Sequence, residues 1–262
     1  MIAPLIDNIV ARQLPRLIAD AEALLSVAAW PDLPARMRII DCDGSRLAGF
    51  CDGSGHRFAQ AHGCRPGAVA VAVAAEAALR VALGWWPDDL PVALAEAGVM
   101  IEAVAAHELA HALVADIDAE LRPGEAGILR SLPVAVGTIL PADSAERTAA
   151  DHGPAWAAAL VILARRCRRY RRGARHRWSK LLDRDLRAYG IDAQAVADVV
   201  ADVADEMRLR DLLAPGGDVV ARVADAIPSA TERAALIAPR LNTTPADPGH
   251  VAPVAAGVAE EW

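Results

Sequence analysis

The chain has 262 residues, a formal net charge of −7 and a hydrophobic share of 54%. This length allows one large core or a core with a helical annex, and the composition excludes a disordered or collagen-like protein. The net charge excludes a uniformly basic nucleic-acid coat, and four scattered cysteines exclude a disulfide framework. No segment reads as a membrane span or a secretion signal, so we expect a cytoplasmic protein that uses no membrane.

The first predicted elements are a helix and three short strands. An amphipathic helix is expected over residues 3–28. Strands follow at Met37–Asp41, Leu47–Cys51 and Ala68–Ala72, and in the last of these small and β-branched residues alternate. Because Asp43-Gly44-Ser45 is a turn signal between the first two strands, the sequence predicts a hairpin, and with it a small antiparallel sheet.

Helices dominate the rest of the chain. The central one is long and apolar, from Val92 to Ile117, and residues 122–148 read as a loop because of their prolines and glycines. Further helices are predicted at 74–84, 154–170, 178–189, 193–212, 219–226 and 231–241. The predicted fold class is therefore α+β, predominantly helical.

One motif carries chemistry: His107-Glu108-Leu109-Ala110-His111, in the middle of the central helix. Histidines at i and i+4 project from one helix face and can bind one tetrahedral Zn²⁺. Glu108 lies about 100° round the helix from His107, where it can reach a metal-bound water without being a ligand. The metal lowers the pKa of that water and Glu108 takes its proton, which is the chemistry of a metallopeptidase.

The alternative is that these are two ordinary helix histidines beside an incidental glutamate. Apolar residues on both sides of the motif predict that the helix is largely buried. Three polar side chains in such a helix would be costly without a metal or partners, so the sequence favours a metal site.

A catalytic zinc requires a third protein ligand and an open fourth position. The first candidate is His152, because Gly153 and Pro154 read as the N-cap and first residue of the next helix and would hold His152 at its mouth. Taken alone, His152 would be interpreted as a surface loop histidine. Glu120 and Glu125 are the rival ligands, and either would give a thermolysin-like His-His-Glu set.

These residues together resemble the SprT-like zinc metallopeptidases. That family joins an HExxH helix to a later His-Gly-x-x-Phe/Trp motif, which here reads His152-Gly153-Pro154-Ala155-Trp156. Upstream, Arg46-Leu47-Ala48-Gly49-Phe50-Cys51 is similar to the small-residue strand that precedes the family's active-site helix. The resemblance covers residues 36–165. The spacer between the histidine motifs is longer than in the family, and the zinc ribbon of some members is absent.

The resemblance implies a zincin-like core in which the small antiparallel sheet packs on the HExxH helix, followed by a C-terminal helical extension. The expected domains are a metallopeptidase domain at 1–175 with a loop insertion at 121–148, the helical extension at 176–241, and a disordered tail at 242–262. It also implies one Zn²⁺ per chain, bound by His107, His111 and His152, with Glu108 as the general base.

The function implied is a zinc-dependent endopeptidase with protein or peptide substrates, including proteins crosslinked to DNA. Two alternatives stay open. One is a DNA-binding or phage-type accessory protein with a zincin fold and little turnover. The other is a thermolysin-like metallopeptidase that cuts a dedicated regulator.

A basic stretch at residues 165–180 holds nine arginines and lysines and no acid. Such a stretch can neutralise phosphates, and Tyr170 and Trp178 could stack on single-stranded bases. The alternative is a solvated helix end whose cations complement the helix dipole. The candidate DNA-contacting residues are Arg165, Arg166, Arg168, Arg169, Arg171 and Arg172.

Overall fold

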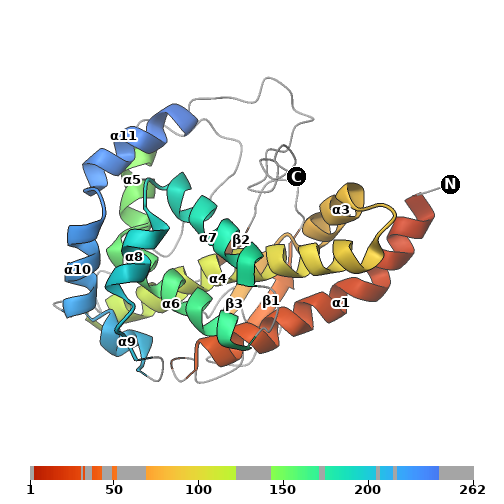
Figure 1. The fold of residues 1–262 in the computed structure, drawn as a ribbon, viewed down its shortest axis with the longest axis horizontal. Helices are drawn as coiled ribbons and strands as arrows, with labels where there is room; N and C mark the ends of the chain where they lie inside the picture. The colour runs from red at the N-terminus through yellow and green to blue at the C-terminus, as the bar shows by residue number, and fades with distance from the viewer. Residues whose placement is uncertain are drawn as a thin grey trace.

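A computed structural model describes residues 3–30, 32, 37–42, 49–51, 69–121, 143–170, 175–204, 207–214 and 217–241. In these ranges the chain is mostly helical with one small sheet, which confirms the predicted predominance of helix (Figure 1). Residues 122–142 of the loop predicted at 122–148 and the predicted disordered tail at 242–262 lie outside the described residues. The rest of that predicted loop, 143–148, is wrong, because these residues are helical.

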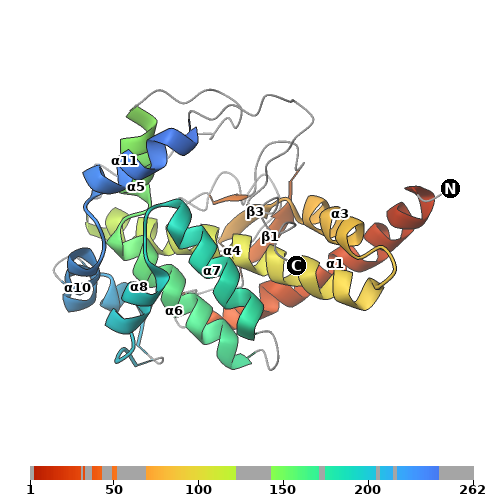
Figure 2. The same cartoon turned by 45° about the horizontal axis from the view of Figure 1, so that its top comes forward.

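The helix α4 (Leu90–Leu121) is the centre of the fold. It begins where the Asp89 carboxylate accepts a hydrogen bond from the backbone N–H of Val92 at 3.1 Å, an N-terminal cap. α4 packs against α1 (Ala3–Ala28), α3 (Ala75–Trp85) and α6 (Pro154–Tyr170), as Figures 1 and 2 show. The helices predicted in these four places are confirmed, with α4 longer than expected at both ends.

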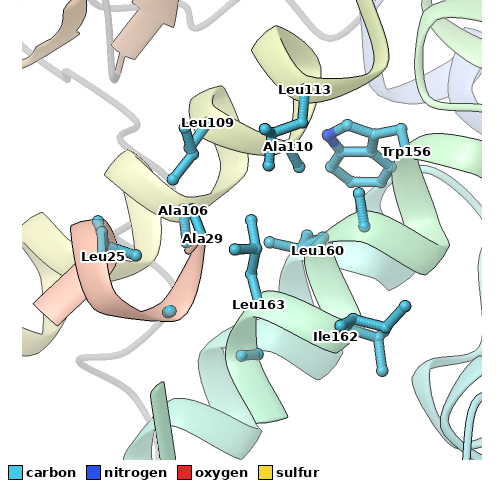
Figure 3. Packing of buried hydrophobic residues seen from close by; sticks show 14 of the residues in the cluster. Leu25, Ala29, Ala106, Leu109, Ala110, Leu113, Trp156, Leu160, Ile162 and Leu163 are labelled. Atoms are coloured by element: carbon cyan, nitrogen blue, oxygen red, sulfur yellow. The ribbon is translucent and has the colours of Figure 1, made fainter. Parts of the chain in front are cut away.

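The main hydrophobic core lies where α1, α4 and α6 meet. Figure 3 shows labelled side chains from the end of α1 (Leu25, Ala29), from α4 (Ala106, Leu109, Ala110, Leu113) and from α6 (Trp156, Leu160, Ile162, Leu163). Each is at most 5% exposed. The alanines let the helix backbones approach closely, and close packing fixes how α4 is rotated about its axis. Trp156 marks the end of this core that adjoins the histidines of α4.

The sheet differs from the prediction. Its strand order is β1-β3-β2, with β1 at Arg38–Asp41, β2 at Gly49–Cys51 and β3 at Ala70–Val73. β1 and β3 run parallel, with Arg38 paired to Ala70, whereas the short β2 runs antiparallel to β3. The predicted hairpin of the first two strands is therefore wrong, and so is the antiparallel sheet built on it. The predicted turn at 43–45 lies outside the described residues.

Burial explains why β3 takes the central position. All four of its residues are buried, which is typical of a strand covered on both faces. Parallel pairing requires a long connection between the two strands, and residues 42–69 provide one. At the end of β1, Asp41 accepts hydrogen bonds from the N–H groups of Ala75 and Glu76 at 2.8 and 3.0 Å, which joins the sheet to the start of α3.

The remaining helices surround the two ends of α6. They are α5 (Asp143–Asp151), α7 (Arg175–Ala188), α8 (Ala193–Val199), α9 (Leu209–Leu212), α10 (Asp218–Ala226) and α11 (Ala230–Leu241). α5 was not predicted, because its first residues follow a run rich in proline and glycine. The single helix predicted at 193–212 is two helices. It breaks where the carbonyls of Val200 and Val203 accept hydrogen bonds from the Arg165 guanidinium.

The segment Leu90–Val114 of α4 is long and apolar enough to cross a membrane by length and composition alone. A buried core helix has the same properties, and here α4 packs against helices and strands along its length. The expectation of a cytoplasmic protein without a membrane partner remains a prediction.

Candidate metal centre

Three histidines from two parts of the chain meet beside the core. His107 and His111 lie one turn apart on α4, and His152 lies between α5 and α6. Pro154 is the first residue of α6 and the Gly153 carbonyl accepts a hydrogen bond from Ala157 N–H, so the predicted helix start after His152 is confirmed. His152 is only 9% exposed, which excludes the alternative of a surface loop histidine.

The ring nitrogens face one another at the spacing of metal ligands. Nε2 of His152 lies 3.2 Å from Nε2 of His111 and 3.3 Å from Nε2 of His107. Ligand atoms of all three residues lie within 4.8 Å of one another. Two nitrogens bound to one tetrahedral zinc at 2.0–2.1 Å are separated by about 3.3–3.4 Å. The three histidines could therefore hold one metal ion without rearrangement.

Hydrogen bonds on the far side of two rings decide which nitrogen carries the proton. Nδ1 of His107 donates to the Asp185 carboxylate at 2.8 Å, and Nδ1 of His152 donates to the Thr148 carbonyl at 2.7 Å. A carboxylate and a carbonyl only accept hydrogen bonds, so in each neutral ring the proton sits on Nδ1. The Nε2 lone pair of His152 then faces the Nε2 atoms of His107 and His111. His107 presents a lone pair in the same way once it loses its second proton.

Two aromatic side chains hold the rings in place. Tyr189 stacks on His152, with ring centroids 3.6 Å apart and an interplanar angle of 9°. The Trp156 ring stacks on His111 with centroids at 5.5 Å, and meets the edges of the other two imidazoles at 4.9 and 4.6 Å. Its Nε1 also donates a hydrogen bond to the His107 carbonyl at 3.4 Å. The histidine side chains are therefore ordered by packing before any metal binds.

Burial keeps two of the three imidazoles neutral. It lowers the pKa of His152 to about 3, helped by the nearby charge of His107. The same two causes, with His152 added, hold the pKa of His111 well below its usual value. For His107 burial also lowers the pKa, but the charge and hydrogen bond of Asp185 outweigh it and raise the value to about 8. A metal ion would displace that proton from His107, whereas the other two rings already offer lone pairs at neutral pH.

Glu108 adjoins this cluster on α4. Burial raises the pKa of its carboxyl to about 7, although the charge of His107 opposes the shift. A carboxyl with a pKa near 7 can both accept and return a proton at neutral pH, which is the property of a general base. The role of Glu108 as a general base remains a prediction.

Asp185 and Tyr189 are functional candidates that the sequence prediction missed. They lie one helical turn apart, on α7 and just beyond its end. The signal that could have found Asp185 is its position between Leu182 and Leu186, which are 8% and 0% exposed. An acidic residue on the buried stripe of a helix needs a partner, and here the partner is His107.

The alternative third ligands are not placed by the structure. The side chain of Glu120 and all of Glu125 lie outside the described residues. Among the described residues, the three histidines form the cluster that could hold a metal.

The basic stretch divides into two groups of arginines. Arg165 and Arg166 point into the fold. The first donates to the carbonyls of Val200 and Val203, just after α8, and the second, 3% exposed, donates to the carbonyls of Ala28 and Met207. Arg168 is half-buried, which lowers its pKa, and Arg169 is exposed. Arg171, Arg172 and the side chains of 173–179 lie outside the described residues. A DNA contact through this stretch remains a prediction.

No protein-family model, no curated protein and no solved structure matches this chain.

Proposed function

We propose that this chain is a zinc-dependent endopeptidase of the SprT-like type. The observation that carries the proposal is the set of Nε2 atoms of His107, His111 and His152, of which His152 lies 3.2 Å from His111 and 3.3 Å from His107, with acceptors on Nδ1 of His107 and His152. Three protein ligands are typical of catalytic zinc, and His107, whose pKa is about 8, would give up a proton to become one of them. The buried set of three also favours His152 over Glu120 or Glu125 as the third ligand.

When bound, zinc polarises the substrate carbonyl and lowers the pKa of water in the site. Glu108 accepts a proton from the attacking water as its oxygen bonds to the peptide carbon. The same carboxyl returns the proton to the amide nitrogen when the C–N bond breaks, so that water is divided between the two products. A carboxyl pKa of about 7 in the metal-free site suits both transfers.

The first test is the metal content of the purified chain. We expect about one zinc per chain and its loss in His152→Ala. Zinc retained in His152→Ala but lost in Glu120→Ala or Glu125→Ala would contradict the three-histidine set.

The second test separates catalysis from binding. Glu108→Gln should keep zinc and lose cleavage of unfolded protein and peptide substrates. Glu96→Gln, the same change on the same helix, is the control and should keep both zinc and cleavage. An undiminished cleavage rate in Glu108→Gln would overturn the mechanism.

Action on proteins attached to DNA is the part of the proposal that depends on the basic stretch. Because Arg165 and Arg166 bind backbone carbonyls, the residues that would contact phosphate are Arg168, Arg169, Arg171 and Arg172. Replacing these four by alanine should weaken DNA binding and make it less sensitive to salt. Absence of DNA binding by the native chain at low salt would remove DNA from the proposal and leave the peptidase.

A further inference from the structure

Arg233 is a buried arginine on α11 that binds the backbone of the third histidine. Only 2% of the Arg233 surface is exposed. One terminal nitrogen of its guanidinium donates to the His152 carbonyl at 2.7 Å, and Nε donates to the Pro228 carbonyl at 3.1 Å. A hydrogen bond therefore connects α11 directly to His152, although Arg233 and His152 are 81 positions apart in the sequence.

Packing alone does not account for an arginine at this position. Burial lowers the pKa of the Arg233 guanidinium, which means that its charge is held at a cost. A methionine or leucine would fill the same space without that cost. What an arginine adds is a fixed, planar donor group, and here that group holds the carbonyl of His152.

His152 is held on three sides. The Thr148 carbonyl fixes Nδ1, the Tyr189 ring covers the imidazole face, and Arg233 holds the main chain. The first contact is local to α5, whereas the other two come from the helices after residue 175. The hydrogen bond from Arg233 to the His152 carbonyl fixes the position of the His152 backbone, and with it the point from which the imidazole extends.

The surrounding packing brings α11 to this position. Ala145 and Ala149 of α5 form one buried cluster with Ala234 and Ile237 of α11. Beside them, Gly190 has φ +71°, and a Cβ there would lie 3.1 Å from a methyl carbon of Leu236 and 3.3 Å from Cγ of Arg233. Only glycine fits both the dihedral angle and the space. The backbone at Tyr189 and Gly190 and helix α11 can therefore approach closely because residue 190 is a glycine.

We propose that Arg233 is a positioning residue of the metal centre: by binding the His152 carbonyl it places the Nε2 atom of His152 against those of His107 and His111. The inference rests on the metal-binding part of the proposed function and not on peptide hydrolysis. It gives the C-terminal helices a role in completing the metal site.

The test measures zinc affinity of the full-length chain by competition with a chelator. Arg233→Met keeps the apolar stem and loses the donor, and we expect affinity to fall about tenfold, the lower end for residues that orient metal ligands. Arg233→Lys restores a cation that can donate and should recover part of the loss. Arg187→Met on the exposed face of α7 is the matched control and should bind zinc as the native chain does.

A double-mutant cycle with His152→Ala tells positioning from general stabilisation. His152→Ala should lose zinc on purification but keep a weak affinity through His107 and His111, which a titration measures. If Arg233 acts through His152, Arg233→Met has no further effect on that weak affinity. An equal loss in both backgrounds, or native affinity in Arg233→Met, would overturn the inference. Should Arg233→Met not fold by circular dichroism, the same cycle is run with Arg233→Leu, which also lacks a donor, and the same outcomes apply.

Cobalt substitution provides an independent signature. Visible absorption of Co²⁺ reports coordination geometry, so Arg233→Met should alter the spectrum of the loaded protein and Arg187→Met should not. Zinc binding without peptide cleavage would overturn the proposed function and leave this inference standing. Failure of the native chain to bind zinc or cobalt would overturn both.

Discussion

The Asp185 carboxylate of α7 accepts a hydrogen bond from Nδ1 of His107 on α4 at 2.8 Å, across 78 residues of sequence. Both side chains are largely buried, 18% and 13% exposed. A carboxylate in this place fixes the proton on Nδ1, orients the ring and makes Nε2 a better donor of electrons to a metal. The pair therefore links the HExxH helix to a helix that the motif itself does not include.

Asp185→Asn should weaken zinc binding about 10- to 100-fold, the range typical of partners that orient metal-binding histidines. The amide keeps the shape of the carboxylate but not its charge, so His107 is less basic and its ring is less fixed. Chelator competition measures the effect. Asp183→Asn, a half-exposed neighbour paired with Arg187, is the control; if it weakens binding as much as Asp185→Asn does, the assigned role is wrong.

The stability of the metal-free protein should decrease in mild acid. The pKa of His152 is about 3 in the folded chain and 6.5 in the unfolded chain, so the unfolded chain takes up the proton first. This contribution to stability is complete above pH 6.5 and is lost as the pH falls towards the folded value. His111 acts in the same direction. The raised pKa values of His107 and Glu108 act in the opposite direction, because each contributes stability that is lost as the pH rises through about 8 and about 7, respectively. Glu108 therefore opposes the loss below pH 6.5, as one group against two.

The measurement is the melting temperature of chelator-treated protein between about pH 6.5 and pH 5, a window above most carboxylate titrations. His152→Phe keeps an aromatic ring against Tyr189 and removes the titrating group. Its melting temperature should depend less on pH than that of the native chain. An unchanged slope would mean that His152 is not buried as a neutral imidazole.

Gly190→Ala should destabilise the fold by about 1–3 kcal/mol, because alanine is strained at this backbone angle and its Cβ would press on α11. Gly84 provides an opposite control on α3, where a Cβ would meet nothing within 4 Å. Gly84→Ala should leave stability unchanged or raise it by up to about 1 kcal/mol, since alanine favours helix. Urea denaturation of both variants gives the comparison, and equal effects would contradict the proposed contact.

Arg166→Met should lower the free energy of unfolding by about 1–3 kcal/mol, because it leaves the buried carbonyl of Ala28 without its donor and removes a part-buried hydrogen bond to the Met207 carbonyl. Arg169→Met, three residues later and exposed, should change it by less than about 0.5 kcal/mol. Urea denaturation distinguishes the two. If Arg166→Met proves as stable as Arg169→Met, the basic stretch is a solvated face after all.

Local patterns predicted the parts of the site that are encoded locally. His107 and His111 share a helix face because of helical periodicity, and the Gly153-Pro154 start of α6 indicated how His152 would be held. Asp185 and Arg233 approach the site through tertiary packing, and no short spacing predicts which face of α7 or α11 turns towards α4. The sequence therefore predicted the ligand cluster but not the residues that orient it.

The errors in the fold have the same origin. A good turn signal between the first two strands favoured their pairing, but the fully buried β3 takes the place between them. The periodicity at 193–212 was helical throughout, yet a guanidinium from α6 binds the carbonyls where the helix stops. In both places an interaction from a distant part of the chain outweighs the local preference.

If Arg233 has the positioning role proposed above, the three histidines would reach their full metal affinity late in synthesis. A growing chain that has passed His152 holds all three imidazoles but still lacks Asp185, Tyr189 and Arg233. Arg233 is the last of these to be made, because α11 follows all the other described helices. The tightest metal binding would therefore wait for the finished protein.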